Sequence, residues 1–214
     1  MEFSSWDILK NLLLATRWTI VLSIAGFISG GIAGLVLLML RIARRRAARD
    51  AARLYIELFQ GTPLLLQLFL IFFGLPLIGV NVRPWLAAGT ALTLSASAYL
   101  AEIWRGCVEA VPSGQWDAAA ALGLNRYRGL RLVILPQALR IAVAPTVGYS
   151  VQLVKSTALT SIIGFEELLR TGDIITNATF APFTVYGIVV MIYFALCFPL
   201  TVFARRVERR MAWR

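Results

Sequence analysis

The sequence predicts an all-α integral membrane protein, and its composition and patterning lead to this fold class. The chain of 214 residues is 59% hydrophobic and 15% charged, whereas soluble domains are about 45–50% apolar and about 25% charged. Its apolar residues form long segments, each close to the roughly 20 residues that a helix needs to cross a bilayer. We expect a single transmembrane domain, residues 1–214, with five spans at about 17–40, 55–78, 84–106, 136–160 and 183–204.

The first expected span, 17–40, carries glycines at intervals of four residues, namely Gly26, Gly30 and Gly34. This spacing places small residues on one helix face, where another helix can approach closely in lipid. The partner is either a helix of the same bundle or a second copy of the chain. Before this span, Met1 to Ala15 is either an amphipathic helix at the membrane surface or an extension of the span.

The second and third expected spans carry polar groups in apolar surroundings. In 55–78, Gly61 and Pro63 break the first turns, and Gln67 lies at mid-span, where a buried amide needs a partner. Gln67 therefore either makes a structural hydrogen bond or lines a transport pathway. In 84–106, small hydroxyl residues are typical of helix contacts or of a cavity lining.

The fourth expected span, 136–160, contains a lysine. Lys155 lies fifteen residues beyond Arg140, roughly 22 Å along a helix axis, so we expect it in the outer part of the bilayer. An ionisable group at that depth indicates function, as an attractor of a substrate carboxylate or a brace for a gate. Snorkelling to the surface or a structural hydrogen bond is the alternative. Together with Gln67 and the neighbouring Gln152, Lys155 is a candidate pathway residue.

The positive charges predict the orientation of the chain. Arginines gather between spans one and two, between spans three and four, and after span five. These are Arg41, Arg44, Arg45, Arg46, Arg49 and Arg53; Arg105, Arg126, Arg128 and Arg131; and Arg205, Arg206, Arg209, Arg210 and Arg214. Because cytoplasmic loops carry the excess of basic residues, we expect the N-terminus outside and the C-terminus in the cytoplasm. The net charge of +10 is then explained by the basic residues that orient the chain in the lipid membrane, and it does not indicate binding to nucleic acid.

Several kinds of chemistry are not expected from this sequence. It has no histidine, no C-x-x-C pattern and no Walker lysine loop, so it predicts neither a His-based catalytic site nor an ATP site. Cys107 and Cys197 are isolated, and we expect them to be small buried hydrophobes. We expect no cofactor, no metal site and no enzymatic activity of the chain itself.

The segment GQWDAAAALGLNRYRGLRLVILP lies between spans three and four and differs from both. Its DAAAAL run has strong helix propensity, Ser113 and Gly114 precede the run as capping candidates, and Gly123 follows where helices often end in a left-handed residue. A helix of about two turns is marginal alone in water. We therefore expect it to dock, either on its own bundle or on another protein.

The same segment resembles the signature loop of the membrane subunits of bacterial ABC importers. That pattern is Glu-Ala-Ala, three residues, Gly, nine residues and an Ile-x-Leu-Pro-like ending. Here the positions hold Asp117-Ala118-Ala119, Gly123 and Val133-Ile134-Leu135-Pro136, with Asp in place of Glu. The flanking motifs FQGTPLLLQLF, AYLAEIWRG, ILPQALR and LVKSTALTSIIGFEEL are similar to the polar amino-acid uptake branch.

This resemblance implies a type I ABC importer permease, with five spans and a cytoplasmic coupling helix within the loop 107–135. Such a permease would move polar amino acids across the bacterial inner membrane as a homodimer or heterodimer. A dimer of cytoplasmic ATP-binding-cassette ATPases would drive it, and a periplasmic or lipid-anchored binding protein would supply the amino acid. The ATPase-coupling residues would be Asp117, Ala118, Ala119 and Gly123. An ion-coupled secondary transporter and a non-transporting membrane scaffold are the alternatives.

Overall fold

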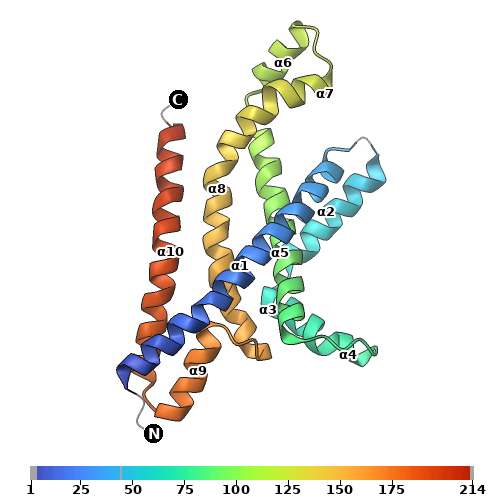
Figure 1. Cartoon of the computed structure of the whole chain (residues 1–214). Coiled ribbons are helices and arrows are strands. Elements are labelled where there is room, and N and C mark those ends of the chain that lie inside the picture. Colours follow the sequence, from blue (N-terminus) through green and yellow to red (C-terminus); the bar gives the residue numbers. More distant parts are fainter. Residues whose placement is uncertain (1–3, 44, 213–214) are drawn as a thin grey trace.

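A computed structural model describes residues 4–43 and 45–212 of the chain, and every regular element in these ranges is helical. The elements are α1 (Ser5–Arg41), α2 (Arg46–Gly61), α3 (Leu64–Phe69), η1 (Leu70–Gly74), α4 (Leu75–Leu77), α5 (Pro84–Glu109), α6 (Ser113–Ala121), α7 (Arg126–Gly129), η2 (Leu130–Ile134), α8 (Leu135–Ser156), η3 (Thr157–Ile163), α9 (Leu168–Thr179) and α10 (Pro182–Ala212). The predicted all-α class is confirmed. Figure 1 shows α6 and α7 at one end of the molecule and α9 at the other, and we call these the α6 end and the α9 end.

Four helical stretches are long and apolar enough to cross a membrane, namely α1, α5, the run Arg126–Ile163 and α10. Helix α2 and the stretch α3 to α4 pass the same test only when taken together, and they meet at an angle of 102°, as in a broken span or a re-entrant loop. The break falls at Thr62, which has an extended backbone because the next residue is Pro63. Four of the five expected spans thus have a matching helix by length and composition, and the second has one if the bent pair counts as a single span.

Helix α1 begins at Ser5 and continues without a break through the first expected span. Ser4 caps it, since its side chain accepts a hydrogen bond from the backbone N–H of Trp6 at 3.4 Å. Ile8 and Leu12 are buried against α9 and α10. The N-terminal segment, from its first described residue, is thus an extension of the first span and not a separate surface helix.

The glycine face of α1 packs against α5, which α1 crosses obliquely (Figure 1). A Cβ added at Gly30 would lie 2.5 Å from the Cβ of Ala96, and one added at Gly34 would lie 3.0 Å from the carbonyl oxygen of Ser97. Such close approach is the purpose of small residues between helices in lipid. A helix of the same chain therefore occupies this face, which leaves no space for a second copy there.

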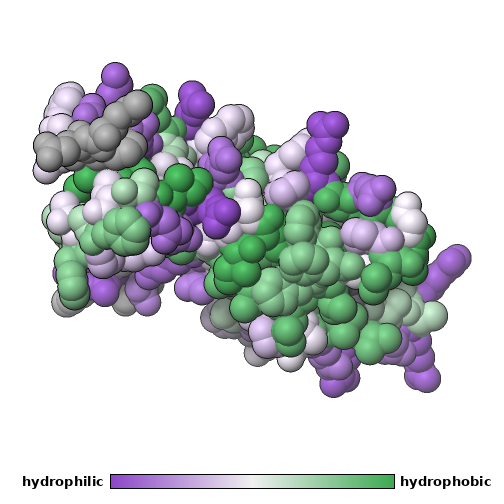
Figure 2. All heavy atoms as spheres, turned by 90° about the horizontal axis from the view of Figure 1, so that it is seen from below, coloured by the Kyte–Doolittle hydropathy of each residue, from purple (hydrophilic) through white to green (hydrophobic). Residues whose placement is uncertain are grey.

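Two apolar clusters hold the rest of the bundle together. Leu22, Leu92 and Leu153 join α1, α5 and α8. Near the α9 end, Leu12, Leu168 and Val185 join α1, α9 and α10. Seen from the α9 end, the surface over α3 and α4 is a broad apolar patch (Figure 2). Exposed apolar surface of this extent in a membrane protein is expected to face lipid or another subunit.

Candidate docking helix and transport groove

Helix α6 is a short, well-terminated helix that protrudes from the α6 end (Figure 1). It ends in a Schellman motif: the N–H of Gly123 donates to the carbonyl of Ala120 at 2.9 Å, and the N–H of Leu124 donates to that of Ala119 at 3.1 Å. Gly123 has φ +72°, as its sequence position predicted. The predicted start was wrong in detail, because Ser113 is the first helical residue and no side chain caps the helix.

The two faces of α6 differ in exposure. Ala119 is buried, and a Cβ added at Gly129 of α7 would meet its methyl group at 3.4 Å. Asp117 and Ala118 are exposed. Beyond them, Leu122 is 78% exposed at the tip. Of the four predicted coupling residues, Ala119 therefore packs on its own chain, and the structure adds Leu122 to the exposed surface.

Helix α6 is firmly joined to the spans. Trp116 packs on a cluster formed by Val111, Ile134 and Ala138. The side-chain amide of Gln137 also donates to the side-chain oxygen of Gln115 at 3.2 Å. Since η2 leads directly into α8, these contacts attach α6 to the start of α8.

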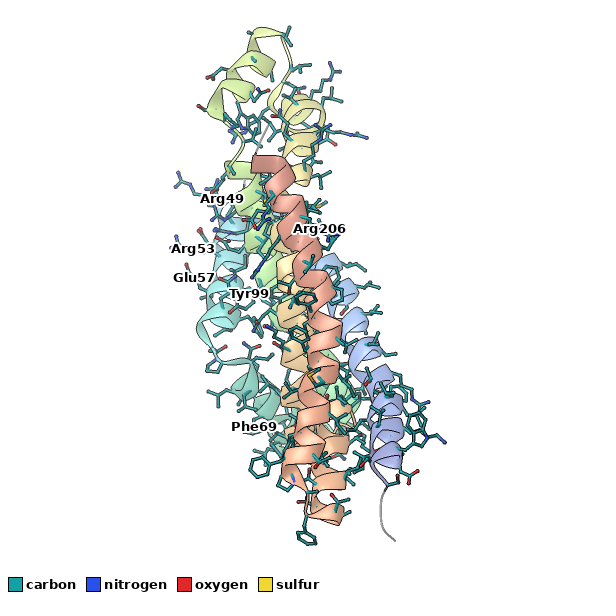
Figure 3. The ribbon with its side chains drawn as sticks, turned by 90° about the vertical axis from the view of Figure 1, so that its left-hand side faces the viewer. Arg49, Arg53, Glu57, Phe69, Tyr99 and Arg206 are labelled. Carbon is teal, nitrogen blue, oxygen red and sulfur yellow. The ribbon has the colours of Figure 1, made fainter. Side chains whose placement is uncertain are left out.

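The outer face of α1 is apolar, whereas α2 mixes charged side chains with the exposed Leu54 and Leu58. The outer face of α1 presents exposed aliphatic side chains, which are Ile20, Val21, Ile24, Ile28, Ile32, Leu35, Val36 and Met39. On the side away from α1, Figure 3 shows Arg49, Arg53 and Glu57 in a row along α2, with Tyr99 beside them. Arg53 and Glu57 form an ion pair at 2.6 Å, and Tyr99 stacks on Tyr149 of α8 with ring centroids 5.5 Å apart.

A groove of about 810 Å³ runs between α8 and α10 and brings together two of the predicted pathway residues. Gln152 and Lys155 line it from α8, and Thr201, Arg205 and Glu208 line it from α10. Both Gln152 and Lys155 are exposed in the isolated chain. The groove thus offers amide, ammonium, guanidinium and carboxylate groups on a helical wall that is otherwise apolar.

The third predicted pathway residue, Gln67, lies elsewhere and is buried. Its side-chain amide donates to the carbonyl oxygens of Phe59 and Thr62 at 2.9 and 3.1 Å and contacts the Thr62 hydroxyl at 3.0 Å. These carbonyls have lost their helical partners at the bend between α2 and α3. The contacts correspond to the structural alternative, in which Gln67 stabilises the bend.

Comparisons with known proteins agree with this architecture. Residues 23–213 match the family described as binding-protein-dependent transport system inner membrane component. The chain belongs to this family. It is therefore a multi-pass component of the inner membrane and a permease subunit in fold and family.

Two relatives that align with nearly the whole chain are permease proteins of amino-acid transport systems. The L-cystine transport system permease protein of Bacillus subtilis strain 168 is 35% identical over 99% of this chain and 89% of its own length. The glutamine transport system permease protein of Escherichia coli K12 is 33% identical over 96% of this chain and 95% of its own.

Two solved structures share the permease fold. A crystal structure of an amino acid ABC transporter with histidines superposes with a TM-score of 0.92 at 32% identity, covering 98% of this chain and all of that one. An inward-facing methionine transporter, MetNI, has a TM-score of 0.69 at 21% identity, covering 96% of each chain, and shows the fold alone.

Proposed function

We propose that this permease moves polar amino acids through the inner membrane, driven by a separate ATPase that docks on α6. The observation that carries the proposal is α6 itself, a helix with a defined end, an exposed tip and a rigid connection to α8. The names of the relatives for glutamine, cystine and amino-acid transport support the cargo class. The chain's own sequence has no motif for ATP binding, which agrees with an ATPase on a separate subunit.

The proposed topology places the α6 end in the cytoplasm. The basic residues at and near this end, including Arg126, Arg128 and Arg131, follow the positive-inside rule. Helix α10 ends toward the same end of the molecule, and α1 begins at the α9 end (Figure 1). An extracytoplasmic binding protein, periplasmic or lipid-anchored, would then meet the permease at the α9 end.

The proposed pathway runs along the polar side of the bundle, between two permease subunits. Charged side chains are costly against lipid and face a cavity or a partner instead. Arg53 belongs to the basic residues expected on the cytoplasmic side, but its ion-pair partner Glu57 lies within the second expected span. Glu57 therefore favours a second permease subunit over lipid on that side, whereas the aliphatic face of α1 favours lipid. Within the pathway, Lys155 would attract the substrate carboxylate and Gln152 would hydrogen-bond to it. We assign Gln67 to the bend of the second span.

The deciding experiment purifies the permease from its membrane, identifies the co-purifying subunits and measures uptake in proteoliposomes. We expect an ATPase to co-purify, and uptake to require ATP inside the vesicles and the binding protein outside. Uptake that follows an ion gradient without any ATPase would establish the secondary-transporter alternative. A complex that binds an ATPase but transports nothing would establish the scaffold alternative.

One variant tests the docking helix specifically. Gly123→Arg places a bulky side chain at φ +72°, which costs an L-residue about 1–2 kcal/mol, and adds a charge to the docking surface. We expect this variant to stay in the membrane but to lose ATP-driven uptake. The control is Gly123→Asn, since asparagine tolerates the left-handed conformation. Normal uptake and ATPase stimulation by Gly123→Arg would refute a role of α6 in coupling.

A further inference from the structure

A fully buried carboxylate lies where three helices meet at the α9 end. Glu167 precedes α9 and has no exposed surface. Its carboxylate accepts hydrogen bonds from the Tyr193 hydroxyl of α10 at 2.8 Å, from the Thr19 hydroxyl of α1 at 3.3 Å and from the backbone N–H of Arg170 at 2.9 Å. Thr19 in turn accepts from the backbone N–H of Leu168 at 3.1 Å. We call Thr19, Glu167 and Tyr193 the outer clamp.

The outer clamp is an unusual way to join helices. In the part of the chain that the structure describes, no basic side chain forms an ion pair with Glu167. Burying a carboxylate without a cation is costly unless it receives several hydrogen bonds. Burial accordingly raises the pKa of Glu167, while the bonds donated by backbone N–H groups, Tyr193 and Thr19 oppose that rise. A pair of apolar side chains would join the same helices at lower cost, so a buried polar junction points to a need for a specific geometry.

The clamp fixes the position of α9 relative to the spans. Helix α9 does not have the length and composition of a span, and it lies beside the ends of α1 and α10 (Figure 1). Its remaining contacts with these helices are largely aliphatic, as between Leu168 and Val185. Aliphatic contacts are non-directional, whereas the clamp contributes directed bonds from one group to both neighbours.

The clamp is also connected to the transport groove. The chain passes from Lys155 through η3 and the left-handed Gly164 to Glu167. Lys155, at the start of this short connection, lines the groove, and Glu167, at its end, belongs to the clamp. On α10, Tyr193 lies on the same helix as the groove residue Thr201. The clamp is therefore joined to both walls of the groove, to α8 through η3 and directly to α10.

We propose that the outer clamp transmits docking of the extracytoplasmic binding protein from α9 to α1 and α10, with Glu167 as the positioning residue. This proposal rests on the function proposed above, because it requires a binding protein that acts at the α9 end. The clamp residues do not contact the amino acid. They fix the orientation of α9, whose exposed surface would face the binding protein. They also link α9 to the helices that line the groove.

The chain offers a matched control for the test. Tyr193→Phe removes the hydroxyl that binds the buried Glu167, whereas Tyr186→Phe removes a hydroxyl that also joins α10 to α9, by an exposed bond of 2.9 Å to Asp173. Thr19→Val removes the second donor at nearly constant volume, and Thr19→Ser restores it. Each variant is assembled with its ATPase and binding protein in proteoliposomes. Basal ATPase activity, its stimulation by the binding protein and uptake are then measured.

We expect Tyr193→Phe and Thr19→Val to reduce stimulation by the binding protein about tenfold, which is the effect of losing one hydrogen bond to a charged group. Basal ATPase activity should be unchanged, and Tyr186→Phe and Thr19→Ser should behave as wild type. Undiminished stimulation in both clamp variants would overturn the proposal. So would a parallel loss of basal activity, since that indicates a merely structural role. A wild-type complex without any stimulation or ATP-driven uptake would instead overturn the proposed function.

Discussion

The contact between α1 and α5 at Gly30 gives a prediction that separates internal packing from dimerisation. Replacing Gly30 by alanine adds one methyl group at the point where the two helices are closest. If the face packs internally, as in the structure, the variant loses stability without any change in oligomeric state. If the face were a dimer contact, the isolated chain would be unaffected and the dimer would weaken.

The expected loss of stability follows from the space around two adjacent glycines, Gly30 and Gly31. A methyl group at Gly30 would lie 2.5 Å from the Cβ of Ala96, whereas at Gly31 the nearest atom, Cη2 of Trp104, is 3.8 Å away. Carbon atoms attract best at about 3.5–4.0 Å, so the first site is overpacked and the second is not. Overpacking costs about 1–3 kcal/mol. Both variants gain up to about 1 kcal/mol in helix propensity, which cancels in their comparison.

The assay is thermal unfolding of the two purified variants in the same detergent. Since 1 kcal/mol shifts the melting temperature by about 2–4 °C for a chain of this length, Gly30→Ala should unfold roughly 2–12 °C below Gly31→Ala. Cross-linking in membranes should give the same proportion of dimer for both. Equal melting temperatures, or a selective loss of dimer in Gly30→Ala, would refute the packing argument.

Three other outcomes are expected. Lys155→Met should lower amino-acid uptake by at least about tenfold, the effect of a lost charged hydrogen bond, and Lys155→Arg should retain most of it; normal uptake by the methionine variant would exclude a carboxylate contact. Leu122→Glu should abolish co-purification of the ATPase without changing the melting temperature, because the side chain is 78% exposed; an intact complex would place the docking surface elsewhere. The raised pKa of Glu167 contributes stability that is complete below the unfolded value of about 4.3 and is lost as pH rises through the folded value. The melting temperature of the wild type should therefore fall relative to that of Glu167→Gln as pH rises, and parallel curves would contradict the shift.

Local features of the sequence were sufficient for much of the fold. Apolar segments of fixed length predicted the spans because a bilayer imposes that length. Gly123 was assigned correctly because the left-handed end of a helix depends on neighbouring residues alone. The arginine-rich stretch before residue 55 was placed outside the second expected span, but α2 already begins at Arg46. The many arginines lowered the hydrophobicity of this stretch below that of a span, although it forms an amphipathic helix whose Ala52 and Ile56 are buried.

Contacts between distant residues could not be predicted in the same way. Thr19 and Glu167 are 148 positions apart, and no local pattern marks one as the partner of the other. The orientation of α6 was similarly inaccessible: the alanine run predicted a helix, but only its packing on Gly129 shows that Ala119 faces inward. Gln67 was recognised as a buried amide that needed a partner, and the structure supplied the carbonyl oxygens of a bend.

Helix α8 connects the α6 end of the permease to the α9 end. At one end it continues η2, and contacts such as that between Gln137 and Gln115 attach it to α6. At the other end it passes through η3 to Glu167. Between these ends, Pro145 lies inside α8 and also lines the groove. A proline removes a helical hydrogen bond and permits bending at its position, so the helix is most easily bent where the groove is. We therefore expect a displacement at either end of α8 to bend the helix near Pro145 and to change the width of the proposed pathway.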